Sequence, residues 1–79
     1  MIVVAKIKLA DARAELRLSQ DELAKLARIS KPVIVNAERG LRIQRISAHA
    51  ILKALNAARR DAGVLPLSIA DIDWKIVGE

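Results

Sequence analysis

The stretch that decides the fold runs from Leu18 to Gly40 and reads LSQDELAKLARISKPVIVNAERG. Two serines in it, Ser19 and Ser30, are good N-cap residues, so each predicts the start of a helix. Glu22 follows Ser19 by three residues and completes a capping box. Gly40 is a natural left-handed terminator. The stretch therefore predicts two short helices with a tight turn between them.

The interiors of both segments have a helical pattern. Four apolar residues form the expected buried stripe of the first helix, which should end near Arg28: Leu23, Ala24, Leu26 and Ala27. Pro32 stands in the first turn of the second helix, where a missing N–H costs nothing. The β-branched run Val33-Ile34-Val35 favours a strand when it is taken alone. Signals for capping on both sides favour a helix instead.

Helices are also expected on either side of this unit. Lys6 to Leu16 has apolar residues at helical spacing and predicts a first helix. Ser47 can cap a last helix that persists to about Asp61. The pair Arg59-Arg60 in that helix is expected to be a solvated helix end.

From Ile69 onward the chain alternates between apolar and polar residues and predicts a half-buried strand. Its partner is either the strand-like segment Ile2-Val3-Val4 or a strand of a second copy. We expect a single domain, residues 1–79, with a core at 6–62 and an extension at 63–79 that serves dimerisation. Three residues on the apolar side are expected in the dimer interface: Trp74, Ile72 and Ile76.

The chain has 79 residues and a formal net charge of +5, but this charge is unevenly distributed. Between Lys25 and Arg60 there are nine cations and a single anion, Glu38, whereas the rest of the chain carries a net charge of −3. Such a basic segment is typical of a protein that binds a polyanion, and a merely solvated face is the alternative. Basic membrane helices usually carry Trp or Phe opposite the charge, and this segment has neither.

Several function classes find no support in the sequence. Cysteine is absent, and no apolar run approaches the ~20 residues that cross a bilayer. The N-terminus lacks the length and order of a signal peptide, so we expect a soluble, cytoplasmic protein. No cluster of histidine and carboxylates has the spacing of metal ligands, and three glycines cannot build a phosphate-binding loop. We therefore expect no enzyme activity, no metal and no cofactor.

The motif Leu-Ser-Gln-x-x-Leu-Ala from Leu18, with Ile29-Ser30, Ile34 and Glu38-Arg39-Gly40, resembles the phage repressor/Cro-type helix-turn-helix family, also called the xenobiotic-response-element family. The resemblance covers about Leu9 to Leu55. It implies an all-α fold of four to five helices, to which the short C-terminal strand would be added. It also implies double-stranded DNA as the partner, with the second motif helix in the major groove.

The resemblance assigns roles to individual residues. Arg13 matches the arginine that commonly pairs with the glutamate at Glu38, and Gln20 matches a residue that contacts a phosphate and braces the recognition helix. Base-edge positions of the family fall on four residues: Lys31, Pro32, Val35 and Asn36. Backbone contacts are expected from Gln20, Ser30, Arg39, Arg42 and Arg28.

The side-chain chemistry agrees with these base-reading roles in part. Asn36 can form a bidentate pair with adenine, and Lys31 can donate to guanine. Val35 can pack on a thymine methyl group, whereas Pro32 cannot hydrogen-bond a base. Arg28 stands in the turn, where many members of the family have glycine, so we expect some backbone strain there.

Two functions follow as hypotheses. The first is a repressor that binds a palindromic operator as a homodimer. The second is the antitoxin of a toxin–antitoxin pair, which binds a toxin protein and represses its own operon. Unpaired strand edges favour the second weakly, because they invite another chain to add a strand.

Overall fold

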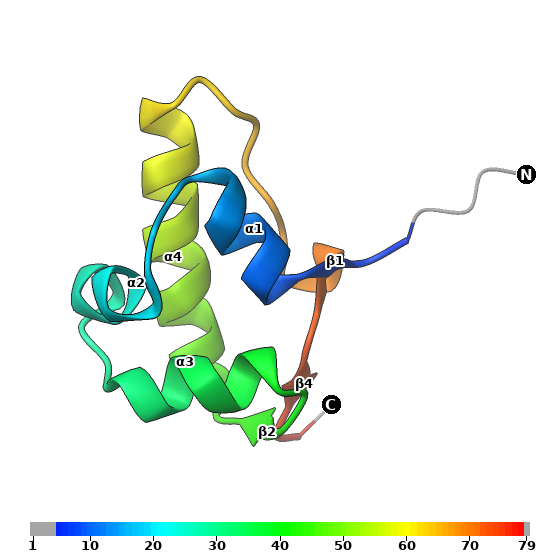
Figure 1. The fold of residues 1–79 in the computed structure, drawn as a ribbon. Coiled ribbons are helices and arrows are strands. Elements are labelled where there is room, and N and C mark those ends of the chain that lie inside the picture. Colours follow the sequence, from blue (N-terminus) through cyan, green and yellow to red (C-terminus); the bar gives the residue numbers. More distant parts are fainter. Residues whose placement is uncertain (1–4, 79) are drawn as a thin grey trace, which may run out of the picture.

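The structure is a computed structural model, and it describes residues 5–78 as a small bundle of helices with short strands along one side (Figure 1). In chain order the elements are β1 (Ile7–Lys8), α1 (Leu9–Glu15), α2 (Gln20–Ala27), α3 (Lys31–Glu38), β2 (Arg42–Ile43), α4 (Arg45–Asp61), η1 (Ile69–Asp71, a 3₁₀ helix), β3 (Ile72–Asp73) and β4 (Lys75–Ile76). The helical fold class expected from the sequence is confirmed. The expected strand partner at residues 2–4 lies outside the described residues.

The start of α2 has the expected capping box. Ser19 Oγ accepts a hydrogen bond of 3.0 Å from the backbone N–H of Glu22, and Glu22 Oε1 accepts one of 2.9 Å from the N–H of Ser19. Hydrogen bonding by Ser19 lowers the pKa of Glu22 below its ordinary value. The backbone N–H of Ser19 makes the larger contribution, and its side chain makes the smaller one. The expected cap of α4 is wrong: the N-cap is Gln44, and Ser47 lies inside the first turn. Pairing of β2 keeps the chain extended up to Ile43, so the helix begins directly after it.

Left-handed residues terminate the helices. Four of them follow the ends of the four α-helices: Arg17 (φ 56°), Arg28 (φ 58°), Gly40 (φ 79°) and Gly63 (φ 74°). After each one, the next N–H reaches back to a carbonyl five residues earlier, as Leu41 does to Asn36 at 2.9 Å. The two arginines hold a conformation that costs a residue with a Cβ about 1–2 kcal/mol. The strain expected at Arg28 is therefore present, and Arg17 shares it.

The core lies where the four helices meet, with α4 running through the middle of the molecule (Figure 1). The largest fully buried side chains come from every helix and from the tail: Leu9, Leu23, Ile34, Ile51, Leu55 and Ile72. Each such side chain stabilises the fold by roughly 1.5–3 kcal/mol when it leaves water. Leu26, expected in the buried stripe of α2, is 56% exposed, because α2 turns Leu23, Ala24 and Ala27 toward the core instead.

The C-terminal tail, residues 63–78, folds back along the bundle and pairs with two distant segments. β3 lies parallel to β1, with Ile72 opposite Ile7, and β4 lies parallel to β2, with Ile76 opposite Ile43. In Figure 1 the tail descends from β1 at the start of α1 to β2 beyond the end of α3. The tail thus joins the first helix to the turn that follows α3.

This arrangement buries the three residues that were predicted to lie in a dimer interface. Ile72, Trp74 and Ile76 are only 0%, 9% and 6% exposed within a single chain. The indole Nε1 of Trp74 also donates a hydrogen bond of 3.2 Å to the carbonyl of Ile69. Because their own chain already covers these side chains, they belong to the core and leave little surface for contact with a second copy.

Arg59 is also placed differently from expectation. It is 7% exposed, and its Nε donates to the Leu65 carbonyl at 2.7 Å while its Nη1 contacts Glu15 Oε2 at 3.2 Å. Nearby, the Asn56 amide donates to the carbonyl of Leu67 and accepts from its N–H, both at 2.8 Å. These bonds hold the connector after α4 against the helix. Arg59 is therefore a structural residue. Its partner, the carbonyl of Leu65, comes close only when the connector folds back, so the sequence pattern does not indicate the contact.

Replacing Trp74 should test whether the tail is part of the core. We expect Trp74→Ala to lower the free energy of unfolding by about 3–5 kcal/mol, because it removes the largest side chain that the tail buries. Urea unfolding followed by circular dichroism measures the loss. Leu65→Ala, at a side chain that is 81% exposed, is the control and should change stability by less than about 0.5 kcal/mol. Equal losses in the two variants would contradict the placement.

Candidate nucleic-acid interface

The turn between α2 and α3 sets the two helices of the motif at an angle (Figure 1). Arg28 reverses the chain with φ 58°, and Ser30 follows in extended conformation as the N-cap of α3. Pro32 lies in the first turn, where its ring favours the helical φ. The Ser30 side chain makes no capping hydrogen bond, so its hydroxyl is available to a ligand at this end of the helix.

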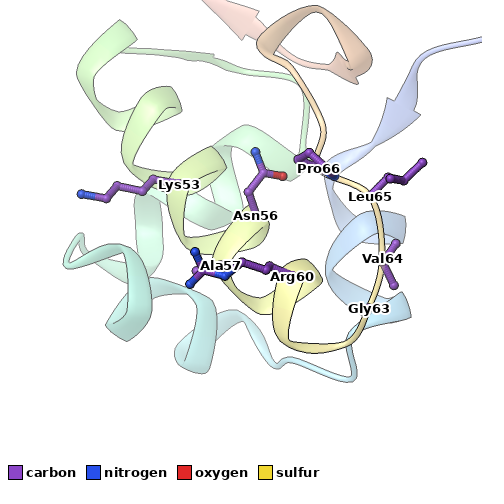
Figure 2. Close-up of a pocket in the computed structure, with 8 residues that line it drawn as sticks. All are labelled: Lys53, Asn56, Ala57, Arg60, Gly63, Val64, Leu65 and Pro66. Carbon is purple, nitrogen blue, oxygen red and sulfur yellow. The ribbon is translucent and has the colours of Figure 1, made fainter.

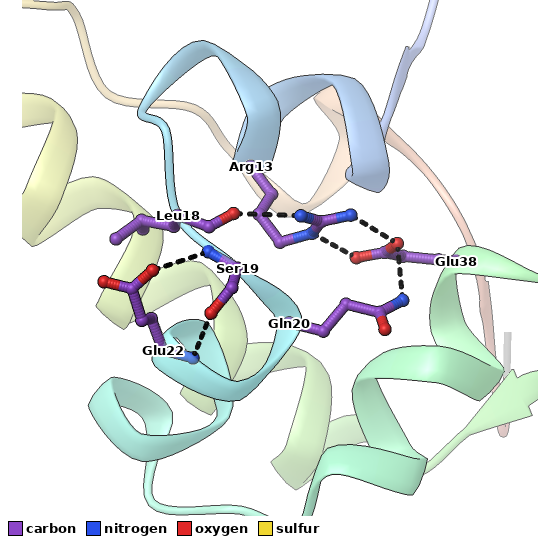
Figure 3. Close-up of polar contacts among 6 residues, drawn as sticks. All are labelled: Arg13, Leu18, Ser19, Gln20, Glu22 and Glu38. Carbon is purple, nitrogen blue, oxygen red and sulfur yellow. Dashed lines mark hydrogen bonds and ion pairs between the residues drawn. The ribbon is translucent and has the colours of Figure 1, made fainter.

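A network centred on Glu38 ties three helices together (Figure 3). Arg13 on α1 donates from Nε to Glu38 Oε2 at 2.7 Å and from Nη2 to Oε1 at 3.0 Å. Gln20, the first residue of α2, donates from Nε2 to Glu38 Oε1 at 3.1 Å. The hydrogen bond with Glu38 raises the pKa of Arg13. The Arg13 and Glu38 side chains are 19% and 8% exposed, so solvent screens this ion pair only in part.

The network explains why one acid stands in the basic segment. The carboxylate of Glu38 accepts hydrogen bonds from Arg13 and Gln20, and Arg13 also donates from Nη1 to the carbonyl of Leu18 at 2.9 Å. The amide nitrogen of Gln20 therefore braces α3 in the free protein. Contact between Gln20 and a phosphate stays a prediction.

One side of α3 is packed and the other is open. Ile34 and Ala37 face the core at 0% and 1% exposure. The expected base-reading residues lie away from it: Lys31 and Pro32 are exposed, and Val35 and Asn36 are half-buried. The structure thus brings the four residues to one helix with the packed side opposite, as a helix that enters a groove requires.

Lys31 has a neighbour that the sequence pattern does not indicate. Its Nζ lies 3.5 Å from Oδ1 of Asp21, and the two side chains are 50% and 63% exposed. An ion pair this open contributes about 0–1 kcal/mol, so a stronger partner can displace it. Asp21 and Lys31 lie in the first turns of α2 and α3. The sequence shows these two positions, but only the geometry of the turn brings the two side chains together.

Three exposed arginines flank α3: Arg28 precedes it, and Arg39 and Arg42 follow it. Within residues 5–78, none of the three forms an ion pair with a carboxylate. Their charge is therefore uncompensated within this part of the chain, at both ends of the helix. Such an arrangement suits a ligand that carries repeated negative charge.

A surface hollow of about 630 Å³ between α4 and the following connector is the main alternative site (Figure 2). Lys53 and Arg60 border it, and Asn56 lines it. The Asn56 amide is already bonded to Leu67, so the hollow has few free polar groups to orient a ligand. Among the described residues there is also no group of three or more metal-binding side chains, and no helix is long and apolar enough to span a membrane.

The network around Glu38 should show up as coupling between its members. We expect Arg13→Met and Glu38→Gln each to destabilise the protein by about 1.5–3 kcal/mol, the range for hydrogen bonds to charged groups. The double variant should lose less than the two single losses combined, because each single change leaves a polar partner unsatisfied. Urea unfolding of all four proteins measures the coupling energy. Strictly additive losses would mean that the pair contributes nothing as a unit.

Comparison with known proteins agrees with this geometry. The helix-turn-helix family matches residues 9–62, which is more than half of the chain. No curated protein and no solved structure matches the chain. The matched segment contains α1 to α4, and with them the Glu38 network and the open side of α3. The chain therefore belongs to the helix-turn-helix family of the phage repressor and Cro type, a family of DNA-binding transcription regulators.

Proposed function

We propose that this protein is a transcriptional repressor that binds a palindromic operator as a homodimer. The α3 helix of each subunit would enter the major groove of one half-site, with the half-sites about 34–36 Å apart. The observation that carries the proposal is the Glu38 network, which holds α3 against α1 and α2. A helix braced on one side and open on the other is ready to enter the groove without rearrangement.

The open side of α3 offers a small set of contacts for reading bases. Asn36 is half-buried, and within the described residues its side-chain amide makes no hydrogen bond, so it is available to pair with adenine. Lys31 would exchange its weak partner Asp21 for guanine acceptors. Val35 would pack on a thymine methyl group. Because Pro32 has no donor, the shape of the DNA would account for part of the specificity.

Contacts with phosphates would anchor this helix at both ends. Arg28 and the free hydroxyl of Ser30 stand at its N-terminal end, and Arg39 and Arg42 stand beyond its C-terminal end. Gln20 would add a contact at the start of α2, where the N–H groups of the helix also favour an anion. Each neutralised phosphate lowers the slope of log K against log salt concentration by about 0.9, so binding should depend steeply on salt.

The homodimer in this proposal needs a surface other than the buried side chains of the tail. Ile46 at the start of α4 is 81% exposed, and Leu41 and Val77 are 47% and 43% exposed. The N–H of Val77 donates to the Ile43 carbonyl at 2.9 Å, which holds the end of the tail close to the start of α4. Exposed apolar side chains gathered in one region are typical of a surface that a second subunit covers.

An antitoxin is the second candidate function, and a separate exposed region favours it. Leu65 is 81% exposed and borders the hollow of Figure 2, together with Val64 and Pro66. This apolar region is a surface on which a partner protein can dock. Purification from the native host discriminates between the two functions: an equimolar small partner favours the antitoxin, and a homodimer alone favours the repressor.

Selection from a random DNA library, followed by binding assays on Asn36→Ala, tests the recognition helix. We expect a palindromic consensus, and we expect Asn36→Ala to weaken binding to it by about 1–3 kcal/mol through the loss of one bidentate base contact. Binding to an unrelated duplex serves as the control and should stay the same. An unchanged sequence preference in the variant would refute the assignment of α3 as the reading helix.

Arg28 allows strain and DNA contact to be separated. Arg28→Gly should raise the free energy of unfolding by about 1 kcal/mol, because glycine accepts the left-handed conformation. The same change should lower DNA affinity, since it removes a phosphate contact. Thermal unfolding and fluorescence anisotropy measure the two effects.

Arg17→Gly is the matched control for this prediction. Arg17 has nearly the same backbone conformation, φ 56°, but lines a hollow beside the C-terminal end of α4. It should gain similar stability and keep full affinity. Equal affinity losses in the two variants would show that Arg28 makes no specific contact with the DNA backbone.

A further inference from the structure

The pairing of β4 with β2 places two cations side by side. Lys75 stands opposite Arg42 in the parallel register, just as Ile76 stands opposite Ile43. The two isoleucines are 6% and 5% exposed, and both cations are exposed. Because partners in register point to the same side of a sheet, Lys75 and Arg42 share the outer side of this strand pair.

Two like charges directly opposite each other destabilise a strand pair. Within residues 5–78, neither Lys75 nor Arg42 forms an ion pair with an acidic side chain. Neither acid of the tail within these residues forms an ion pair with the two cations: Asp71 Oδ2 accepts from the Ser68 N–H at 2.8 Å, and Asp73 stands opposite Lys8 in the register of the other strand pair. The free protein therefore carries a local repulsion that an anion along this surface would relieve.

The same region continues to the end of the recognition helix. Arg39 and Lys75 line one shallow hollow of about 200 Å³, and Lys8 adds a third cation to its lining. Two carboxylates line it as well: Glu38, which is bonded to Arg13 and Gln20, and Asp73. In Figure 1, β2 and β4 lie beyond the C-terminal end of α3. Arg39, Lys75 and Arg42 thus form a row of cations that extends from the helix onto the tail.

We propose that Lys75 is a phosphate-binding residue of the DNA interface, contributed by the tail and not by the helix-turn-helix. It lies outside residues 9–62, the segment that the family matches, and it is the only cation of residues 63–78. This inference rests on the proposed function, because it assumes that the DNA backbone runs past the C-terminal end of α3. The tail then does two things: it buries Trp74 in the core and adds Lys75 to the cations that follow α3.

The salt dependence of DNA binding measures this contact. We expect Lys75→Gln to make the negative slope of log K against log salt concentration shallower by about 0.9, the value for one phosphate on B-DNA. The affinity ratio of the unmodified protein to the variant should then shrink by about 3.5-fold between 50 and 200 mM salt. Lys53→Gln makes the same change at an exposed lysine of α4 that borders the hollow of Figure 2, and it should leave the slope unchanged.

Stability separates a contact with DNA from a structural role. Removal of a like-charge neighbour should leave the melting temperature of Lys75→Gln equal to or above that of the unmodified protein. Lys75→Glu should raise it further by pairing with Arg42, and it should reduce DNA affinity more than Lys75→Gln does. A lower melting temperature in Lys75→Gln, with an affinity loss that does not depend on salt, would overturn the proposal.

Arg39→Gln distinguishes this proposal from the proposed function. If Arg39→Gln makes the slope shallower and Lys75→Gln behaves like Lys53→Gln, the role of Lys75 is refuted and the DNA-binding function stands. If the unmodified protein binds no duplex at low salt, the proposed function fails and the role of Lys75 fails with it. A shallower slope in both Arg39→Gln and Lys75→Gln, but not in Lys53→Gln, supports both the proposed function and the role of Lys75.

Discussion

The position of α3 depends on the carboxylate of Glu38. Two donors from Arg13 and one from Gln20 converge on it, so α1, α2 and α3 are joined at a single point. Ridge-and-groove packing alone leaves two short helices some freedom to slide, because apolar contacts have little direction. Charge-assisted bonds with fixed geometry remove that freedom. The angle at which α3 meets a ligand is therefore set by polar chemistry, while the core supplies most of the stability.

The tail closes the structure from the other side. Its two short parallel strand pairs connect the start of α1 to the segment after α3, and Trp74 fills the space between them. Two-residue strands are too short to be stable alone, so side-chain burial must hold them in place. A chain of 79 residues buries a small apolar core, and the tail adds buried apolar side chains to those of the four short helices. Dimerisation is thus not needed to cover these residues.

The charged side chains near α3 differ in whether they have a partner within the protein. Two acids that lie close to α3 have partners: Glu38 binds Arg13 and Gln20, and Asp21 forms a weak ion pair with Lys31. Arg28, Arg39 and Arg42 are left without carboxylate partners in the described part of the chain, and Arg28 also holds a strained backbone. A protein that binds nothing there would gain stability by neutralising these cations. Their cost to the free protein is understandable if a polyanion covers them, which is the role we propose.

Local sequence determined the helix-turn-helix. The capping box at Ser19, Pro32 in a first turn and Gly40 at a helix end act through neighbouring residues, so their effects could be predicted without the fold. The Arg13–Glu38 pair was expected only from the family resemblance. The tertiary structure alone decided the rest: the burial of Trp74 and Arg59, and the register that sets Lys75 beside Arg42. These depend on partners that are 5 to 44 residues away in the chain, and no local pattern specifies such partners.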